Sequence, residues 1–282
     1  MAPFATLARM TSLGIVGFGN FGRFMAQHLR SRFSVRVHDR QDIADEAAQL
    51  GVVSAPLPEV AASEILVLAV PVQNMEDVLL DLRGLRRLPE LVMDVGSVKV
   101  KPLDLMSRYL PKRVEIVGTH PMFGPQSGRH GIAGLKVVLC PLRTRRLARI
   151  RDFLAREMRL EVLEMSPEVH DSEMAYIQGL THWIAKALRE IKLPDLSLAT
   201  PAYRHLLKIE ENLREDSAAL FRTIETENPF AAAARAELLA KLREIEAEVT
   251  AIADAEAEDR REGVPAAARG PARRRRATRT AS

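Results

Sequence analysis

A glycine-rich segment, GFGNFG at residues 17–22, constrains the fold of this chain more than any other part of the sequence. It follows an apolar stretch, LGIV at residues 13–16, which has the length and composition of a buried strand. After it, mostly apolar side chains recur at the spacing of one helix face: Phe21, Phe24, Met25, His28 and Leu29. A strand, a glycine turn and a helix in this order predict the first half of a dinucleotide-binding unit.

Each glycine has a separate role in such a turn. Gly17 allows the tight bend, Gly19 lets the backbone approach a pyrophosphate, and Gly22 lets the helix pack closely against the strand. The free N–H groups at the start of the helix, near Asn20 and Phe21, are expected to face the phosphates. The turn is therefore a predicted cofactor site.

The next strand-sized run ends at an acidic residue that indicates which cofactor is bound. Asp39 lies 20 residues after Gly19, the distance at which an acid bonds the hydroxyls of the adenosine ribose, as in NAD sites. Arg40 is a candidate partner for the 2′-phosphate of NADP, but the neighbouring carboxylate would repel that phosphate. NAD is the predicted cofactor, and NADP is not excluded.

Further strand-sized apolar runs predict the rest of the sheet. They occupy residues 35–38, 65–70, 91–95, 114–117 and 135–139. Because segments with helical spacing separate them, we expect a parallel sheet covered by helices on both faces. From about Ser166 onward helical spacing replaces the strand pattern, with breaks at Pro194–Pro201 and at Asn228–Pro229. The predicted fold class is α/β: a Rossmann-type doubly wound sheet domain followed by an all-helical domain.

The resulting domain plan has four parts. We expect a short N-terminal extension at residues 1–11, an NAD-binding domain at 12–165, a helical substrate and dimerisation domain at 166–259, and a disordered Arg-rich tail at 260–282. The last predicted helix, from residue 231 to about 261, carries one apolar stripe that needs a partner, in its own domain or in a second subunit. A homodimer is therefore expected.

The charge of the chain lies mainly in this tail. The sequence has a formal net charge of +4, but residues 260–282 contain eight arginines and a single acid, Glu262. The other residues comprise 33 basic and 36 acidic side chains, so we expect no specific nucleic-acid partner for the folded part. The tail has no apolar periodicity, and its composition predicts disorder.

Composition also limits the compartment and the metal chemistry. No apolar run approaches the roughly 18 residues of a membrane span, and residues 1–10 lack the features of a signal peptide, so a cytoplasmic protein without a membrane partner is expected. Cys140 is the single cysteine and lies in an apolar run, as a buried strand residue would. This excludes a disulfide framework and a cysteine-cluster metal site, and no metal is expected.

Two polar segments follow later strands, DVGSVK at residues 94–99 and GTHPMFGP at 118–125. The carboxyl ends of parallel strands meet at one edge of the sheet, so we expect both segments beside the glycine turn. His120 is the predicted general base, because a hydride leaves an alcohol carbon only as the hydroxyl proton is removed. Ser97 is expected to bond the same hydroxyl or to orient the imidazole.

Four segments together resemble the prephenate and arogenate dehydrogenase family of tyrosine biosynthesis. They are GFGNFG, DVGSVK, THPMFGP at residues 119–125 and HDSEMAYIQGLTH at 170–182, within a match from about residue 13 to 230. The resemblance implies NAD-dependent oxidation of the ring alcohol of prephenate or arogenate with loss of the ring carboxylate as carbon dioxide. The products would be 4-hydroxyphenylpyruvate or tyrosine. It also implies a nucleotide-binding domain followed by a helical dimerisation domain.

The resemblance assigns roles to particular residues. His120 matches the catalytic histidine of the family, and Ser97 matches the serine that bonds this histidine and the substrate hydroxyl. His182 matches a histidine of the substrate pocket, and Gln178 in the same segment is a further candidate for substrate binding. For the substrate carboxylate we expect Arg204, with Arg214 and Arg222 as alternatives, because an arginine fork suits a carboxylate.

His170 has two interpretations. It lies 12 residues before His182, so on one regular helix the two side chains would be roughly 120° apart and need not share a face. His170 is either structural, with Asp171 capping the helix or orienting the ring, or functional.

Two other functions fit parts of the pattern. Another two-domain β-hydroxyacid dehydrogenase would require a catalytic lysine in the helical domain, and Lys186 is the candidate. A nucleotide-sensing protein without catalysis is the second alternative, against which Ser97, His120 and His182 argue. The sequence leaves prephenate and arogenate equally open as substrates.

Overall fold

The structure is a computed structural model that describes residues 12–214 and 216–262. The predicted N-terminal extension at residues 1–11 and residues 263–282 of the predicted tail lie outside the described residues. Packing divides the chain into two compact units, Met1–Ala234 and Arg235–Ser282. The first unit contains the sheet and the candidate site.

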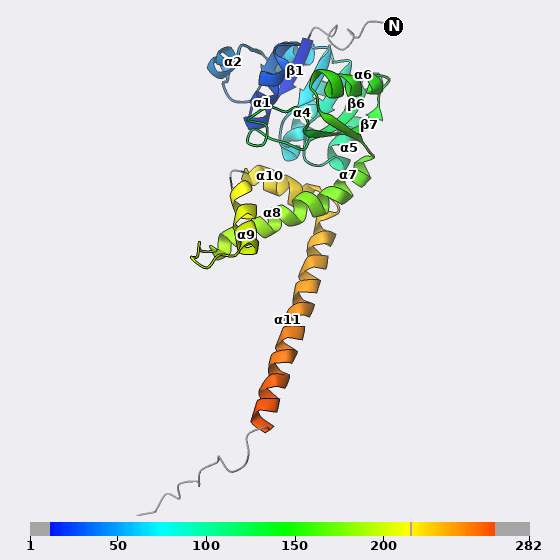
Figure 1. Cartoon of the computed structure of the whole chain (residues 1–282). Helices are drawn as coiled ribbons and strands as arrows, with labels where there is room; N and C mark the ends of the chain where they lie inside the picture. Colours follow the sequence, from blue (N-terminus) through cyan, green and yellow to red (C-terminus); the bar gives the residue numbers. More distant parts are fainter. Residues whose placement is uncertain (1–11, 215, 263–282) are drawn as a thin grey trace, which may run out of the picture. The chain divides into compact units, whose positions relative to one another are not determined.

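An eight-stranded sheet forms the centre of the first unit, with the strand order β3-β2-β1-β4-β5-β6-β7-β8 (Figure 1). The strands are β1 (Ser12–Val16), β2 (Ser34–His38), β3 (Val53–Ser54), β4 (Ile65–Leu68), β5 (Leu91–Asp94), β6 (Glu115–Pro121), β7 (Lys136–Arg143) and β8 (Glu161–Glu164). All neighbouring strands from β3 to β6 are parallel, whereas β7 runs antiparallel to β6 and β8 runs parallel to β7. The doubly wound α/β prediction is confirmed.

The predicted strands are all present, with three differences. The prediction of an entirely parallel sheet is wrong at β7, which reverses direction. The short strands β3 and β8 were not predicted, because β3 has only two residues, both exposed, and β8 begins and ends with exposed glutamates. Strand β6 continues to Pro121, so His120 lies inside a strand and not after one.

Helices cover both faces of the sheet. They are α1 (Asn20–Leu29), α2 (Ala44–Leu50), α3 (Leu57–Ala61), the 3₁₀ turn η1 (Val72–Asn74), α4 (Met75–Arg83), α5 (Val100–Tyr109), α6 (Leu147–Asp152) and the π-helical turn η2 (Phe153–Glu157). Strand side chains alternate between two cores: Ile15 and Val67 pack in one cluster, while Val16 and Leu68 pack in the other. This alternation is what a sheet buried on both sides requires.

The rest of the described chain is helical. It contains α7 (Pro167–Met174), the π-helical turn η3 (Ala175–Leu180), α8 (Thr181–Ile191), α9 (Pro201–Asn212), α10 (Ala218–Arg222), the π-helical turn η4 (Thr223–Glu227) and α11 (Ala231–Glu262). Ser166, Thr200 and Ser217 cap α7, α9 and α10, each accepting a backbone N–H three residues later. The predicted breaks are confirmed, because residues 192–200 separate α8 from α9 and residues 228–230 separate η4 from α11.

The C-terminal end of the helical part departs from the domain plan. Helix α11 continues to Glu262, so the first three residues of the predicted disordered tail, 260–262, are helical. The predicted boundary between residues 165 and 166 coincides with the change from β8 to α7, while the compact unit extends to Ala234. A separate helical domain from residue 166 stays a prediction. Within residues 12–214 and 216–262, no helix combines the length and the apolar character needed to cross a membrane.

Candidate active site

The glycine turn has the geometry expected of a phosphate-binding loop. Gly17 has a φ of +99°, which L-residues with a side chain rarely adopt. A Cβ added to Gly22 would lie 2.0 Å from the carbonyl oxygen of Gly17, so only glycine allows α1 to approach β1 this closely. A Cβ added to Gly19, the N-cap of α1, would meet no atom within 4 Å. The turn therefore leaves open space at the N-terminus of α1, where the exposed N–H groups suit a phosphate.

Asp39 is fixed beside this turn by two backbone hydrogen bonds. The N–H of Phe18 donates to Oδ2 at 2.7 Å, and the N–H of Gln41 donates to Oδ1 at 3.1 Å. Arg40 is directed elsewhere, because its Nη2 lies 3.2 Å from Oδ2 of Asp77 on α4. In this arrangement an acid faces the turn, and the adjacent guanidinium is already paired.

His120 lies in β6, only 3% exposed, and its imidazole contacts a second buried histidine. Nδ1 of His120 lies 2.9 Å from Nε2 of His170 in α7, and the two rings meet edge to face. Nδ1 of His170 lies in turn 2.7 Å from Oδ1 of Asp171. The N–H groups of Lys99 and Val100 donate to the two oxygens of this carboxylate at 2.7 and 2.9 Å.

The environment of His120 determines its protonation. Burial lowers the pKa of His120 well below its usual value, and electrostatic interactions with His170 and Lys99 lower it further. The ring is therefore neutral near pH 7 and able to accept a proton. The hydrogen bonds of the described residues engage Nδ1 and leave Nε2 without a protein partner.

A buried ion pair lies directly beneath these histidines. Nζ of Lys99 donates to Oδ2 of Asp94 and, at 2.6 Å, to the carbonyl oxygen of Thr119. Both charged side chains are fully buried. Burial raises the pKa of the Asp94 carboxyl, and the Lys99 ammonium opposes that rise. No role for this pair was predicted from the sequence, although two charged residues among apolar neighbours are a usable signal.

Ser97 lies half-buried in the loop after β5. Among the described residues its hydroxyl makes no hydrogen bond, and the ring of His120 is bonded to His170 instead. The role of Ser97 at the substrate hydroxyl stays a prediction.

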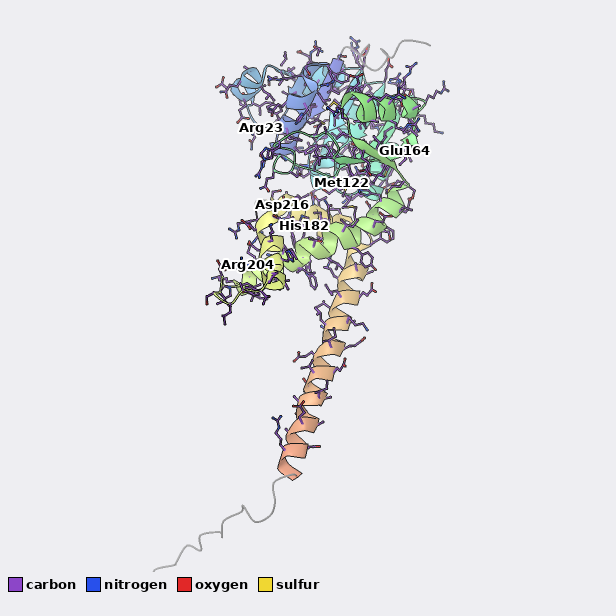
Figure 2. All side chains as sticks on the ribbon, in the orientation of Figure 1. Arg23, Met122, Glu164, His182, Arg204 and Asp216 are labelled. Carbon is purple, nitrogen blue, oxygen red and sulfur yellow. The ribbon has the colours of Figure 1, made fainter. Side chains whose placement is uncertain are left out.

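His182 is the second residue of α8 and forms a second hydrogen-bonded centre. Its Nδ1 lies 2.9 Å from the carbonyl oxygen of Gln178, and its Nε2 lies 3.0 Å from Oδ2 of Asp216. Figure 2 shows the His182 and Asp216 side chains close together. Because both partners are acceptors, both bonds form together only when the ring carries two protons. Oε1 of Gln178 is buried without a partner among the described residues.

The two histidines of the 170–182 segment thus have different partners. On one regular helix they would lie roughly 120° apart. The π-helical turn η3 lies between them and changes the spacing around the axis. His170 joins His120, whereas His182 joins Asp216. Asp216 was not predicted, because its approach to His182 depends on how the chain folds back after α9.

The candidate arginines lie on exposed helix surfaces. Arg204 in α9 and Arg222 in α10 are exposed, and Figure 2 shows Arg204 apart from the His182–Asp216 pair. Arg214 is paired with Glu210 at 2.6 Å. Among the described contacts, none brings these three arginines to His120, so the partner of the substrate carboxylate stays a prediction. Lys186 is half-exposed and paired with Glu190, which disfavours the alternative that needs a catalytic lysine.

Hydrogen bonds fix the helical segment against the edge of the sheet that carries the site. The hydroxyl of Thr223 in η4 donates to Oε1 of Gln73 in η1 at 3.1 Å, and the N–H groups of Lys99 and Val100 after β5 donate to the carboxylate of Asp171 in α7. The glycine turn, the buried histidines and the helical segment therefore belong to one compact unit. Together, fold and site define a dinucleotide-binding protein of the Rossmann class.

Comparisons with known proteins agree with this class and indicate one family within it. Residues 23–159 match the family profile described as "Prephenate dehydrogenase, nucleotide-binding domain". Over 232 residues the chain is 37% identical to Arogenate dehydrogenase 1, chloroplastic, of Arabidopsis thaliana, covering 78% of this chain and 36% of that protein. It is 33% identical over 231 residues to Arogenate dehydrogenase 2, chloroplastic, of the same plant, covering 78% and 64%. The chain belongs to the prephenate and arogenate dehydrogenase family.

Solved structures show the same fold. The prephenate dehydrogenase of Aquifex aeolicus, solved in complex with hydroxyphenyl propionate and NAD+, matches with a TM-score of 0.67 and 23% identity over 90% of this chain and 95% of that one. Synechocystis arogenate dehydrogenase matches with a TM-score of 0.61 and 20% identity over 87% and 93%. The chain spans about a third and just under two thirds of the length of the two Arabidopsis relatives.

Proposed function

We propose that this protein is an NAD-dependent dehydrogenase that oxidises and decarboxylates arogenate or prephenate. The observation that carries the proposal is the buried His120, which is held neutral and whose Nε2 has no partner among the residues that the structure describes. It lies in a strand whose carboxyl end faces the same sheet edge as the glycine turn. A base at this edge can act beside a bound nicotinamide.

The residues present fit an NAD cofactor. The open space at Gly19 and the N-terminus of α1 suit the pyrophosphate, with the N–H groups of Asn20, Phe21 and Gly22 in the first turn of the helix. The N–H of Gly17 already donates to the carbonyl oxygen of His38 at 2.8 Å. Asp39 would accept hydrogen bonds from the adenosine ribose. Its carboxylate repels a 2′-phosphate, and Arg40, the candidate to neutralise that phosphate, is paired with Asp77. These contacts favour NAD over NADP, and the cofactor supplies the hydride acceptor when it is bound.

In the proposed reaction His120 takes one proton from the substrate and later returns it. As the hydride leaves the ring carbinol carbon for the cofactor, Nε2 of His120 takes the hydroxyl proton and the alcohol becomes a ketone. The ring carboxylate then leaves as carbon dioxide, and its bonding electrons make the ring aromatic as a phenolate. His120 returns the proton to this oxygen, which completes the phenol and restores the base. Ser97 would hydrogen bond the same oxygen.

The remaining parts of the substrate are assigned to the helical segment. We propose that His182, with two acceptor partners, and the buried Oε1 of Gln178 contribute to the substrate pocket. Arg204 is the proposed partner of a substrate carboxylate, which would require the exposed α9 to approach the site. The names of the two Arabidopsis relatives favour arogenate as the first substrate to test.

The exposed stripe on α11 supports a homodimer. Leu242, Ile245, Val249 and Ile252 lie three and four residues apart, and each exposes about half of its surface. Apolar residues at this spacing form the seam of a two-helix coiled coil. A second copy of the same helix presents a matching stripe, so we propose that α11 pairs with α11 of another chain.

Initial rates of nicotinamide reduction test the proposed activity. Purified protein would be assayed with L-arogenate and with prephenate, each with NAD and with NADP. A clear rate in one combination identifies substrate and cofactor together, and we expect it with NAD. If folded protein that binds NAD in calorimetry shows no measurable rate in any of the four assays, the proposed function would be overturned.

A further inference from the structure

Behind His120, two further buried side chains are connected in series. His170 is 1% exposed and Asp171 is fully buried, and both belong to α7. Two distances connect the three residues: 2.9 Å from Nδ1 of His120 to Nε2 of His170, and 2.7 Å from Nδ1 of His170 to Oδ1 of Asp171. The mechanism above uses only the first of these residues. We refer to His120, His170 and Asp171 together as the relay.

The direction of each hydrogen bond follows from the carboxylate at the end of the relay. The Asp171 carboxylate accepts backbone N–H groups on both oxygens. Because a carboxylate has no proton to donate, it can only accept a hydrogen bond from the His170 ring. His170 must therefore donate from Nδ1, and in the form of the ring that holds a single proton, Nε2 is left as an acceptor. His120 then donates from its own Nδ1. The lone pair of His120 is left on Nε2, which no side chain or backbone group within residues 12–214 and 216–262 engages.

We propose that His170 and Asp171 are positioning residues, which hold His120 in the tautomer that presents its basic nitrogen, Nε2, to the substrate hydroxyl. They have a second role when His120 takes the proton. The proton on Nδ1 can pass to Nε2 of His170, and the positive charge then lies next to the Asp171 carboxylate. Only the catalytic consequence rests on the proposed function, because the tautomer is a property of the free protein.

The other charged groups around the relay are consistent with this assignment. The ammonium of Lys99 faces His120 from the start of α5, but Asp94 in β5 neutralises it. On β7, burial raises the pKa of the Cys140 thiol to about 12, so this group carries no charge. Among the described residues hydrogen bonded in the relay, Asp171 is thus the carboxylate that can stabilise an imidazolium.

The relay also explains how α7 is positioned. The carboxylate of Asp171 receives the N–H groups of Lys99 and Val100, which begin α5, and its backbone carbonyl receives Nδ2 of Asn228. Asp171 is thereby fixed by two other segments of the chain, the start of α5 and the segment that contains Asn228. A carboxylate held this firmly fixes the ring of His170, and His170 fixes the ring of His120.

Nitrogen NMR of protein labelled with ¹⁵N-histidine tests the tautomer directly, without substrate. We expect His120 of the wild-type protein to show a protonated Nδ1 and an unprotonated Nε2 near neutral pH, with signals assigned from the His120→Asn variant. His170→Gln places an amide oxygen near the former Nε2 and should keep this pattern. His170→Leu removes the acceptor and should abolish the preference. Protonation of Nε2 in the wild-type protein would overturn the proposal.

Kinetics of the same variants separate positioning from a purely structural role. We expect His170→Leu to lower kcat by about 10²-fold and His170→Gln by about 10-fold, with little change in KM or in NAD affinity. His205→Leu, the matched control on the exposed surface of α9, should leave kcat unchanged. Equal activity of wild-type and His170→Leu would contradict the proposal. If His170→Leu fails to fold, the wild-type tautomer and His170→Gln still decide it.

The two proposals fail in different ways. Silence of the wild-type protein with every substrate, together with the expected tautomer, would overturn the proposed function and leave the relay. Normal dehydrogenase rates with Nε2 protonated would overturn the relay and leave the function.

Discussion

Lys99 and Asp94 form an ion pair in which neither side chain has exposed surface. The pair joins the loop after β5 to the end of β5 itself, and Lys99 also bonds the carbonyl oxygen of Thr119, next to His120. The backbone N–H of the same lysine donates to Asp171. Lys99 thus contacts the sheet, the relay and the start of α5 at once.

Lys99→Met should strongly destabilise the protein. The substitution leaves the Asp94 carboxylate buried without its cation, which costs about 3–5 kcal/mol. Denaturant unfolding measures the loss. Lys136→Met is the matched control, because its partner Glu161 is 3.9 Å away and both are exposed, so its cost should be below about 1 kcal/mol. Equal effects of the two substitutions would show that the buried pair adds no stability.

Lowering the pH should reduce the free energy of unfolding, because His120 resists protonation in the folded protein. Its pKa is well below the usual value in the folded protein, so the unfolded chain binds more protons between about pH 6.5 and that lower value. The free energy of unfolding therefore falls as the pH falls below about 6.5, by up to about 1.4 kcal/mol per unit from this group. Urea titrations at several pH values should show a shallower decline for His120→Asn. An identical decline in both proteins would contradict this assignment.

His120→Asn should also remove most of the catalysis. Asparagine cannot take the hydroxyl proton, so we expect turnover to fall by about 10²-fold or more. NAD affinity, measured by calorimetry, should be nearly unchanged, because the glycine turn is intact. Near-normal turnover would show that His120 is not the base.

Asp39→Ser should relax the cofactor preference. It removes the charge that repels a 2′-phosphate, so the ratio of kcat/KM for NAD to that for NADP should fall by about 10-fold. Asp77→Ser provides the complementary variant, because it frees Arg40 while leaving Asp39 in place. An unchanged ratio in Asp39→Ser would show that this carboxylate does not determine the preference for NAD over NADP.

A charge placed on the apolar stripe of α11 should dissociate the dimer. Ile245→Glu puts a carboxylate into the proposed seam, and light scattering should then report the mass of one chain in place of two. Ala247→Glu adds the same residue off the stripe and should leave the mass unchanged. A wild-type protein that is monomeric at working concentration would refute the proposed pairing.

The sequence could predict the features that depend on local spacing. The glycine turn, Asp39 and the six apolar runs were found because their patterns lie within short segments. The reversal of β7 and the contact between His120 and His170, 50 residues apart, depend on tertiary packing. The π-helical turn η3 was also hidden, since its six residues read as ordinary helix. For the same reason, Asp216 could not be assigned to His182 in advance.

The pairing of β6 with β7 has a consequence for the evolution of such enzymes. His120 lies opposite Val138 in a ladder of hydrogen bonds, so the candidate base is part of the rigid sheet. The residues proposed to select the substrate lie on helices joined by loops, where substitutions and changes of length are better tolerated. A lineage could therefore exchange one substrate for another by altering α8 and α9, while the proton-transfer apparatus is inherited unchanged.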